Sequence, residues 1–355
     1  MAFFKVENVK VSGISACVPK QIEDNAQFPL FDDKDLQNFV ATTGVERKHR
    51  APQGVITSDL CVAAAEALIS DLHWNREDIS ILVFVTQTAD YILPATSPII
   101  QHKLGLGKGC YTLDISLGCS GWVYGMSVVS SLMTNFSAVN GSCKALLLAG
   151  EVTSLQASAD DKSTYPLFGD AGTATALEYQ PGAEPLLFGM NSDGEGYEAI
   201  IINDGGYRNP FSVDSLKKIE RGDGIVSTNL HTVLDGMNVF AFGIREAPRS
   251  VNGLIEAFGL DKDTIDYFTF HQANMLMNEK IRTKLKLPPE KVPYSLKNFG
   301  NTSSASIPLT LVTELCDSLR EKKSRHIACG FGVGLSWGSM YFMADNIACP
   351  ALVEV

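Results

Sequence analysis

Three polar islands in this chain carry residue types that could perform acyl transfer. The first holds Cys119, within residues 114–121, where an apolar strand-like run ends in glycine and a long apolar stretch begins. A thiol at such a strand-to-helix corner lies near the positive end of the helix, which favours the nucleophilic thiolate. The alternative is a small buried residue that packs the start of the helix.

The second and third islands lie far downstream. His271 directly follows a strand-like run at 267–270, and Asn301 lies in a run of small residues at 300–306. Taken alone, a histidine at a strand end is more often structural, and such an asparagine is more often a turn or helix-cap residue. Together, one Cys, one His and one Asn in separate polar contexts indicate acyl transfer through a cysteine thioester.

The elements that must position these residues alternate between two patterns. Period-2 or continuous apolar runs predict strands, and apolar spacing of three and four predicts helices. The predicted strands are 9–15, 81–86, 110–115, 144–150, 174–178, 267–270, 326–329 and 336–343, and the predicted helices are 57–72, 121–135, 240–258 and 305–319. This alternation predicts α/β layers with a largely parallel sheet. Because the series occurs twice, we expect two α/β/α halves, 1–182 and 183–355.

Size and composition limit the classes of protein. A chain of 355 residues, 45% hydrophobic and 19% charged, can form a large globular core. The net charge of -11 argues against nucleic acid as the principal partner. No signal peptide or membrane-length apolar run is evident, so we expect a cytoplasmic protein that does not enter a membrane. Eight dispersed cysteines without a CxxC pair argue against a metal site.

Several motifs resemble the β-ketoacyl-acyl-carrier-protein synthase III family. They are the residues around Cys119 and the strings at 43–47, 94–97, 168–172, 271–274, 300–303 and 331–338, which follow the family order over nearly the whole chain. The resemblance implies a thiolase-like α/β fold, in which two duplicated α/β/α halves form five αβαβα layers, and it implies a homodimer. It also implies a catalytic set of Cys119, His271 and Asn301.

The resemblance further implies a role for each residue. Cys119 would accept an acyl group from a thioester, and His271 and Asn301 would bind the carbonyl of a malonyl thioester as it loses carbon dioxide. A second oxyanion hole would use the backbone N–H groups of Cys119 and Val333, a position where the family usually has glycine. The hairpin and a residue from the partner subunit would line the acyl pocket; these pocket residues are Phe331, Gly332, Gly334 and Leu93. No permanently bound cofactor is implied.

Three departures from the family pattern concern recognition of the acyl donor. Asn38 replaces a tryptophan that stacks on the adenine of coenzyme A, Leu276 replaces an arginine, and Lys162 replaces another arginine. Lysine retains the charge but not the flat guanidinium. We therefore expect a donor carried on acyl carrier protein, or an unusual coenzyme A ester, rather than acetyl-coenzyme A.

A basic helix flank is the candidate docking surface for the carrier protein. Residues 279–291 contain five basic and two acidic side chains, and Lys280 and Lys284 lie one helical turn apart. Acyl carrier proteins are acidic, so we expect Lys280, Arg282 and Lys284, with Lys162, to contact them. A merely solvated helix flank explains the same pattern equally well.

The leading prediction is a decarboxylating condensing enzyme that uses acyl-coenzyme A or acyl carrier protein donors and malonyl carrier protein. One alternative is an acyltransferase of the same fold that passes the acyl group to oxygen or nitrogen in a specialised pathway. Another is a non-catalytic subunit that stabilises an active partner, although such a subunit has no need of the three polar residues. A hydroxymethylglutaryl-type synthase fits less well, because Asn301 completes the set in place of a general base.

Overall fold

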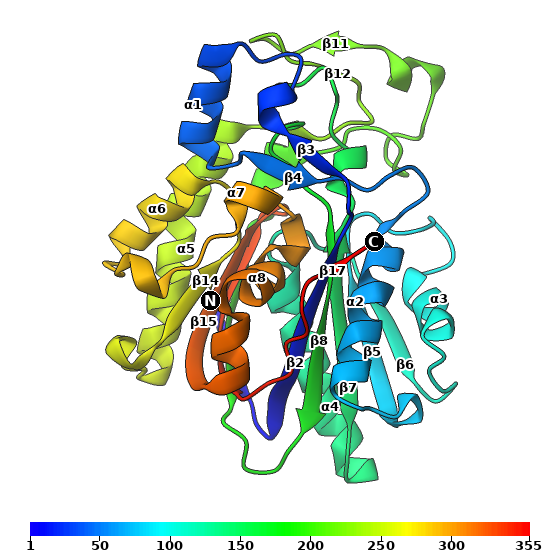
Figure 1. Cartoon of the computed structure of the whole chain (residues 1–355), viewed down its shortest axis with the longest axis vertical. Helices are drawn as coiled ribbons and strands as arrows, with labels where there is room; N and C mark the ends of the chain where they lie inside the picture. Colours follow the sequence, from blue (N-terminus) through cyan, green and yellow to red (C-terminus); the bar gives the residue numbers. More distant parts are fainter.

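The computed structural model describes all 355 residues as five layers, helix–sheet–helix–sheet–helix (Figure 1). The first sheet has six strands in the order β17 (Val353–Glu354), β2 (Val9–Val18), β8 (Ala171–Tyr179), β7 (Lys144–Glu151), β5 (Ile79–Val85) and β6 (Tyr111–Ile115). The second has five strands in the order β1 (Ala2–Val6), β9 (Leu186–Ser192), β16 (Ser336–Asp345), β15 (Lys323–Gly332) and β14 (Tyr267–Phe270).

Two helices form the middle layer. Helices α4 (Gly121–Asn140) and α8 (Ser306–Glu321) pack against strands of both sheets, and their apolar side chains join both sheets in one buried core. Helices α2 (Thr57–Asp71) and α3 (Thr96–Lys103) cover the outer face of the six-stranded sheet. Helices α5 (Gly236–Phe258) and α6 (Met275–Lys284) form the outer layer against the five-stranded sheet. The expected five-layered αβαβα arrangement is therefore present.

The sheets are mixed rather than largely parallel, so that part of the prediction was wrong. Strand β5 runs parallel to β6 and β7, and β14 runs parallel to β15. However, β8 runs antiparallel to both β2 and β7, and β16 runs antiparallel to β15 and β9. The three residues 333–335 that join β15 to β16 are too few for a crossover, so those strands must be antiparallel.

The two halves exchange edge strands. Strand β1, from the N-terminus, pairs with β9 in the five-stranded sheet. Strand β17, from the C-terminus, pairs with β2 in the six-stranded sheet. The predicted boundary near residue 182 falls in the connection between β8 and β9, but each sheet takes one edge strand from the opposite half of the chain.

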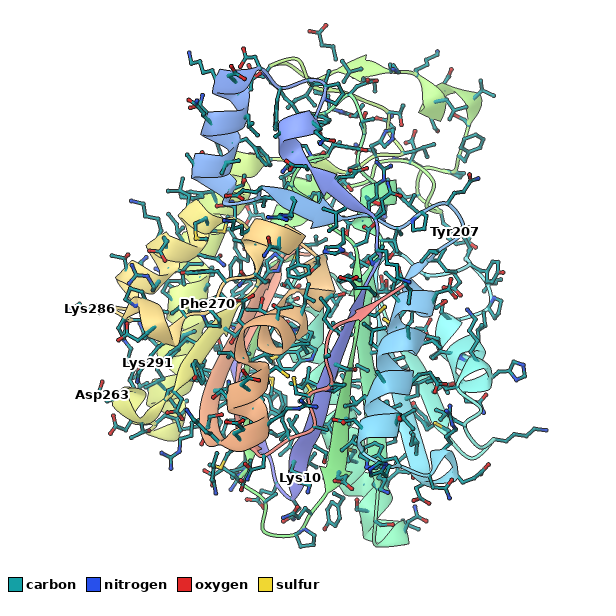
Figure 2. All side chains as sticks on the ribbon, in the orientation of Figure 1. Lys10, Tyr207, Asp263, Phe270, Lys286 and Lys291 are labelled. Carbon is teal, nitrogen blue, oxygen red and sulfur yellow. The ribbon has the colours of Figure 1, made fainter.

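A further group of elements lies above the upper ends of the sheets in Figure 1, and the sequence patterns did not predict it. It contains α1 (Asp33–Thr43), β3 (Ile22–Asp24), β4 (Arg47–His49) and a long excursion between β9 and α5. The excursion carries β10 (Ile200–Ile201), β11 (Ile219–Glu220), β12 (Val226–Ser227) and β13 (Val233–Leu234). Tyr207 projects from this excursion at the edge of the molecule (Figure 2). No helix in the fold has both the length and the apolar character needed to cross a bilayer.

Candidate active site

Cys119 lies at the corner between β6 and α4, as the sequence predicted. Strand β6 ends at Ile115, and α4 begins at Gly121. The hairpin between β15 and β16 packs directly against the cysteine. A Cβ placed on Gly332 would lie 2.5 Å from the Cβ and 2.8 Å from the Sγ of Cys119. Only glycine at position 332 therefore allows the hairpin to approach the thiol this closely.

His271 follows the last residue of β14 and is held as a neutral imidazole. Its Nδ1 lies 2.8 Å from the Oγ of Ser306, and that oxygen accepts a longer hydrogen bond, 3.4 Å, from the N–H of Gln272. We assign the Ser306 hydroxyl as the donor to Nδ1, which places the imidazole proton on Nε2. Burial lowers the pKa of His271 to about 3, so the ring is uncharged at neutral pH.

Asn301 is fixed by hydrogen bonds of both its backbone and its side chain. Its N–H donates to the carbonyl of Leu167 at 2.9 Å, and its carbonyl accepts from the N–H of Gly169 at 3.1 Å. The side-chain Oδ1 accepts from the N–H of Ser303 at 2.9 Å. Nδ2 donates one N–H to the carbonyl of Ala273 at 3.5 Å, so its second N–H is the group of the carboxamide that remains to donate to a substrate.

Ser303, which the sequence did not single out, joins Asn301 to the cysteine. Its Oγ lies 3.8 Å from the Sγ of Cys119, while its N–H holds Asn301. Ser303 has a φ of 49°, a left-handed conformation that non-glycine residues rarely adopt. Such strained conformations persist only where the surroundings fix them, and they cluster at functional sites. The polar string 300–304 was the available signal.

The three predicted catalytic residues face one cavity of about 600 Å³. Cys119, His271 and Asn301 have exposed fractions of 8%, 2% and 6%, so the cavity is their main access to ligand. The hairpin contributes Phe331, Gly332 and Val333 to its wall. Apolar residues of the excursion and of α5 and α6 line another part, namely Ile200, Ile201, Ile202, Leu234, Val239 and Met277.

The Cys119 thiol is not activated in the way that the sequence predicted. Burial raises its pKa above the ordinary value, even though hydrogen bonds from the Ser303 side chain and from the backbone N–H groups of Val333 and Cys119 oppose the rise. The free protein therefore holds a neutral thiol at neutral pH. The prediction rested on the helix N-terminus alone and did not include the loss of water around the sulfur.

Glu151 is a cavity residue that the sequence analysis missed. It ends strand β7, is buried, and accepts hydrogen bonds from the N–H of Gln87 at 3.0 Å and from the hydroxyls of Thr86 and Thr88 at 3.0 and 2.8 Å. Burial raises the pKa of this carboxyl to about 8, and the hydrogen bonds act in the opposite direction. A glutamate at the end of the apolar run 145–150 was the only sequence signal.

Two of the predicted pocket residues do not line the cavity of this single chain. Leu93 is 79% exposed, in an apolar segment with the exposed Tyr91 and Ile92. Gly334 is exposed at the tip of the hairpin, beyond Val333. Both positions therefore lie outside the group that the fold brings together around Cys119.

The four predicted docking residues differ in whether their charges are paired with a carboxylate. Lys280 is exposed and forms no ion pair, and the exposed Lys284 donates to the carbonyl of Ile244 at 3.2 Å. Arg282 pairs with Glu279 at 2.7 Å, and Lys162 pairs with Asp35 of α1 at 3.6 Å. Further basic side chains, Lys286 and Lys291, lie beside this helix at the same edge of the molecule (Figure 2).

Helix α6 also connects this basic surface to the cavity. Asn274, which caps the helix, and Met277, in its first turn, line the cavity. Lys280 follows Met277 by three residues, so the two lie on neighbouring positions of one helix face. The free charge of Lys280 therefore lies within one helical turn of a residue that lines the cavity.

A five-layered fold of this kind, with a Cys, a His and an Asn around one buried cavity, defines the class of thiolase-like condensing enzymes. Comparison with known proteins identifies the family. The model of 3-oxoacyl-[acyl-carrier-protein (ACP)] synthase III matches residues 113–194, and the model of its C-terminal part matches 255–343. The chain belongs to the β-ketoacyl-[acyl-carrier-protein] synthase III family, whose members are condensing acyltransferases.

Individual relatives are similar over nearly their whole length. The β-ketoacyl-[acyl-carrier-protein] synthase III of Bacillus pumilus is 30% identical over 94% of this chain and 98% of its own. The synthase III 2 of Streptomyces coelicolor is 31% identical over 93% of this chain and 92% of its own. Among solved structures, a 3-oxoacyl-(acyl-carrier protein) synthase from Burkholderia xenovorans superposes with a TM-score of 0.92 at 35% identity, covering 100% of this chain and 99% of the other.

Proposed function

We propose that this protein transfers an acyl group from a thioester to Cys119 and then condenses it with malonyl carrier protein to give a β-ketoacyl thioester. The observation that carries the proposal is the convergence of Cys119, His271 and Asn301 on one cavity. Two neutral hydrogen-bond donors beside a buried thiol suit stabilisation of an enolate better than removal of a proton by a base. Both substrates bring their own thiol carriers, so the chemistry requires no resident cofactor.

The first half-reaction is acylation of Cys119. The sulfur attacks the donor thioester carbonyl, the bond to the carrier sulfur breaks, and the carrier leaves as a thiol with the proton from Cys119. Because burial keeps that thiol neutral in the free protein, its proton must depart during the attack. The backbone N–H groups of Cys119 and Val333 donate to the oxyanion that forms on the carbonyl.

The second half-reaction is decarboxylative condensation. Cleavage of the malonyl carbon–carboxylate bond releases carbon dioxide and leaves its electron pair in an enolate, whose oxygen accepts from His271 Nε2 and Asn301 Nδ2. The enolate carbon attacks the acyl carbonyl on Cys119, and the cysteine sulfur leaves as a thiolate, which takes up one proton from solvent to restore the neutral thiol. The low pKa of His271 fits this role, since a neutral imidazole donates without carrying a charge into the cavity.

For partners, we propose a homodimer that receives carrier proteins at α6. The exposed apolar segment at Tyr91, Ile92 and Leu93 supports burial against a second copy, with Leu93 contributed to the acyl pocket of the partner. A homodimer would have a mass in solution of twice 38.4 kDa by light scattering. A monomer that condenses substrates at full rate would exclude the contribution of Leu93.

The experiment that tests the function separates condensation from transfer to another acceptor. Acylated protein, freed of donor, is mixed with malonyl carrier protein, and release of carbon dioxide and formation of β-ketoacyl carrier protein are measured together. We expect equal amounts of both. Loss of the acyl group to an alcohol or amine without carbon dioxide would instead support the acyltransferase of the same fold.

A further inference from the structure

The segment Tyr165–Asp170 holds the backbone of Asn301 in place through hydrogen bonds. Leu167 and Gly169 supply the two backbone hydrogen bonds of Asn301, and Phe168 forms a bridge with it. A Cβ on Gly169 would lie 3.4 Å from the Cβ of Lys48, so the segment also lies directly against β4. The position of the Asn301 carboxamide therefore depends on what fixes this segment.

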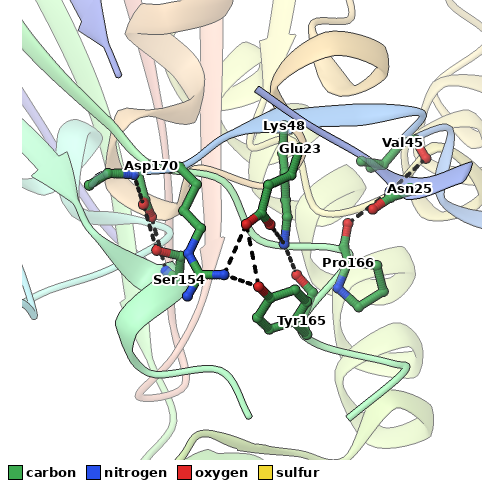
Figure 3. Close-up of polar contacts among 10 residues, drawn as sticks. Glu23, Asn25, Val45, Lys48, Ser154, Tyr165, Pro166 and Asp170 are labelled. Carbon is green, nitrogen blue, oxygen red and sulfur yellow. Dashed lines mark hydrogen bonds and ion pairs between the residues drawn. The ribbon is translucent and has the colours of Figure 1, made fainter. Parts of the chain in front are cut away.

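Two buried side chains from the β3–β4 region bind the main chain of the segment at successive residues (Figure 3). The Lys48 ammonium donates to the carbonyl of Tyr165. The Nδ2 of Asn25 donates to the carbonyl of Pro166 at 3.0 Å and to that of Val45 at 3.1 Å. Lys48 and Asn25 have exposed fractions of only 1% and 2%.

The other end of the segment is fixed by Asp170. Its carboxylate accepts from the N–H of Ala51 at 2.8 Å and from the N–H and hydroxyl of Ser154 at 2.9 and 2.6 Å (Figure 3). Its own N–H donates to the carbonyl of His49 at 3.0 Å. The segment is thus bound at both ends, and Asn301 pairs with its middle.

Burying a charged ammonium group in order to hold a loop costs folding free energy. Lys48 has one carboxylate within ion-pair distance, Glu23 at 3.6 Å, and that carboxylate also pairs with Arg50 at 3.0 Å. Burial lowers the pKa of Lys48 to about 8, while Glu23 and Asp170 favour its charged form. Apolar residues of similar size often stabilise a fold as well as such a buried pair does. The presence of a buried charge at this position is therefore better explained by positioning than by stability.

We propose that Lys48 and Asn25 are positioning residues that hold Tyr165–Asp170, and through it the Asn301 carboxamide, at the substrate carbonyl during decarboxylation. They do not touch the substrate. Cys119 is held by Gly332 and by the start of α4, which make no use of this segment, and its link to Asn301 is the 3.8 Å contact of its Sγ with the Oγ of Ser303. The inference rests on the proposed function, because it assigns Asn301 to the second half-reaction.

The test compares the two half-reactions in Lys48→Met. Acylation of Cys119 is followed by intact-protein mass spectrometry, and condensation by carbon dioxide release from malonyl carrier protein. We expect kcat for carbon dioxide release to fall roughly tenfold to a hundredfold, as for other small misplacements of catalytic groups. The KM for malonyl carrier protein and the acylation rate should stay at the wild-type values. Lys48→Arg, which keeps a buried cation able to donate, should recover part of the loss.

Arg50→Met is the matched control. Arg50 comes from the loop after the same strand and contacts the same Glu23 and the Tyr165 hydroxyl, but it does not bind the main chain of the segment. We expect it to leave carbon dioxide release unchanged. Asn25→Asp, which removes the donor to Pro166 at constant size, should reproduce the selective loss and serves if Lys48→Met does not fold.

The outcomes separate this inference from the proposed function. Wild-type protein is measured first, and acylation without carbon dioxide release would contradict the proposed function. If the wild type releases carbon dioxide but folded Lys48→Met and Asn25→Asp lose both half-reactions equally, or lose neither, the positioning role is wrong.

Discussion

At the scale of single residues, the site combines a neutral thiol, a neutral imidazole and a carboxamide. Each has a fixed orientation: Cys119 by the backbone behind it, His271 by Ser306, and Asn301 by Ser303. A charged imidazole would attract the malonyl carboxylate, whereas a neutral donor favours the enolate that remains after the carboxylate has left. The proposed order of events depends on this neutrality.

The first prediction concerns Asn301. Asn301→Ala should lower carbon dioxide release from malonyl carrier protein by about a hundredfold to a thousandfold, because it removes one of two donors to the enolate oxygen. Acylation of Cys119 should persist, because the oxyanion hole that we propose for that step uses backbone N–H groups. Asn298→Ala, at an exposed asparagine three residues earlier, is the control. If Asn301→Ala lost acylation but kept carbon dioxide release, Asn301 would belong to the first half-reaction instead of the second.

At the scale of elements, the hairpin between β15 and β16 determines how closely a second backbone approaches the cysteine. The second prediction is that Gly332→Ala abolishes acylation of Cys119, because its Cβ would lie 2.5 Å from the Cβ of the cysteine. Gly194→Ala is a suitable control, since a Cβ there meets nothing within 4 Å. Acylation of Gly332→Ala at the wild-type rate, by mass spectrometry, would mean that the hairpin lies elsewhere in solution.

Helix α6 supplies the third prediction. Charge reversal at Lys280 and Lys284 should raise KM for malonyl carrier protein several-fold and leave kcat unchanged, because exposed charges act mainly on encounter with the partner. The effect should shrink as salt is added. Lys322→Glu, at an exposed lysine beyond the end of α8, is the control. An unchanged KM in the double variant would place docking on another surface.

The elements also show how far sequence reasoning reaches. The predicted helix 57–72 is observed as Thr57–Asp71 and the predicted strand 267–270 as Tyr267–Phe270, because long periodic or bounded apolar runs leave little ambiguity. The excursion at 194–235 was not predicted, since its strands have only two residues each and depend on tertiary contacts. The roles of Ser303, Glu151 and Lys48 could not be predicted either, because they depend on contacts with Cys119, Thr88 and Tyr165, which are remote in sequence.

At the scale of the whole molecule, the site lies where the two halves meet. Cys119 follows a strand of one sheet, and His271 follows a strand of the other. Helices α4 and α8 pack between the sheets, and each begins beside a site residue: Cys119 precedes α4, and Ser306 is the first residue of α8. Unfolding of either half would therefore separate the catalytic set.

The fourth prediction concerns stability in acid. Burial lowers the pKa of His271 to about 3 and that of His326 to about 4, below the ordinary value near 6.5. At a pH between the folded and the unfolded pKa of each histidine, the unfolded chain binds a proton that the folded protein does not. Each histidine therefore makes the free energy of unfolding fall as pH falls below about 6.5. The loss is up to about 1.4 kcal/mol per pH unit for each histidine.

His326→Phe isolates one of these contributions. Between pH 7 and pH 5, the free energy of unfolding measured with urea should fall more in the wild type than in this variant. His326 lies outside the cavity and stacks on Phe342 with ring centroids 4.8 Å apart. The phenyl ring that the substitution introduces can keep this aromatic packing. Parallel pH dependences of the two proteins would mean that His326 has the same pKa in the folded and the unfolded protein.

Covalent capture of an acyl group at Cys119 tests the first step of the proposed chemistry. Wild-type protein and Cys119→Ala are incubated with a panel of acyl-coenzyme A and acyl carrier protein thioesters and weighed intact by mass spectrometry. We expect at least one donor to add its acyl mass to the wild type, the modified peptide to contain Cys119, and Cys119→Ala to gain nothing. Equal acylation of Cys119→Ala, or a wild type left unmodified by every donor, would contradict it.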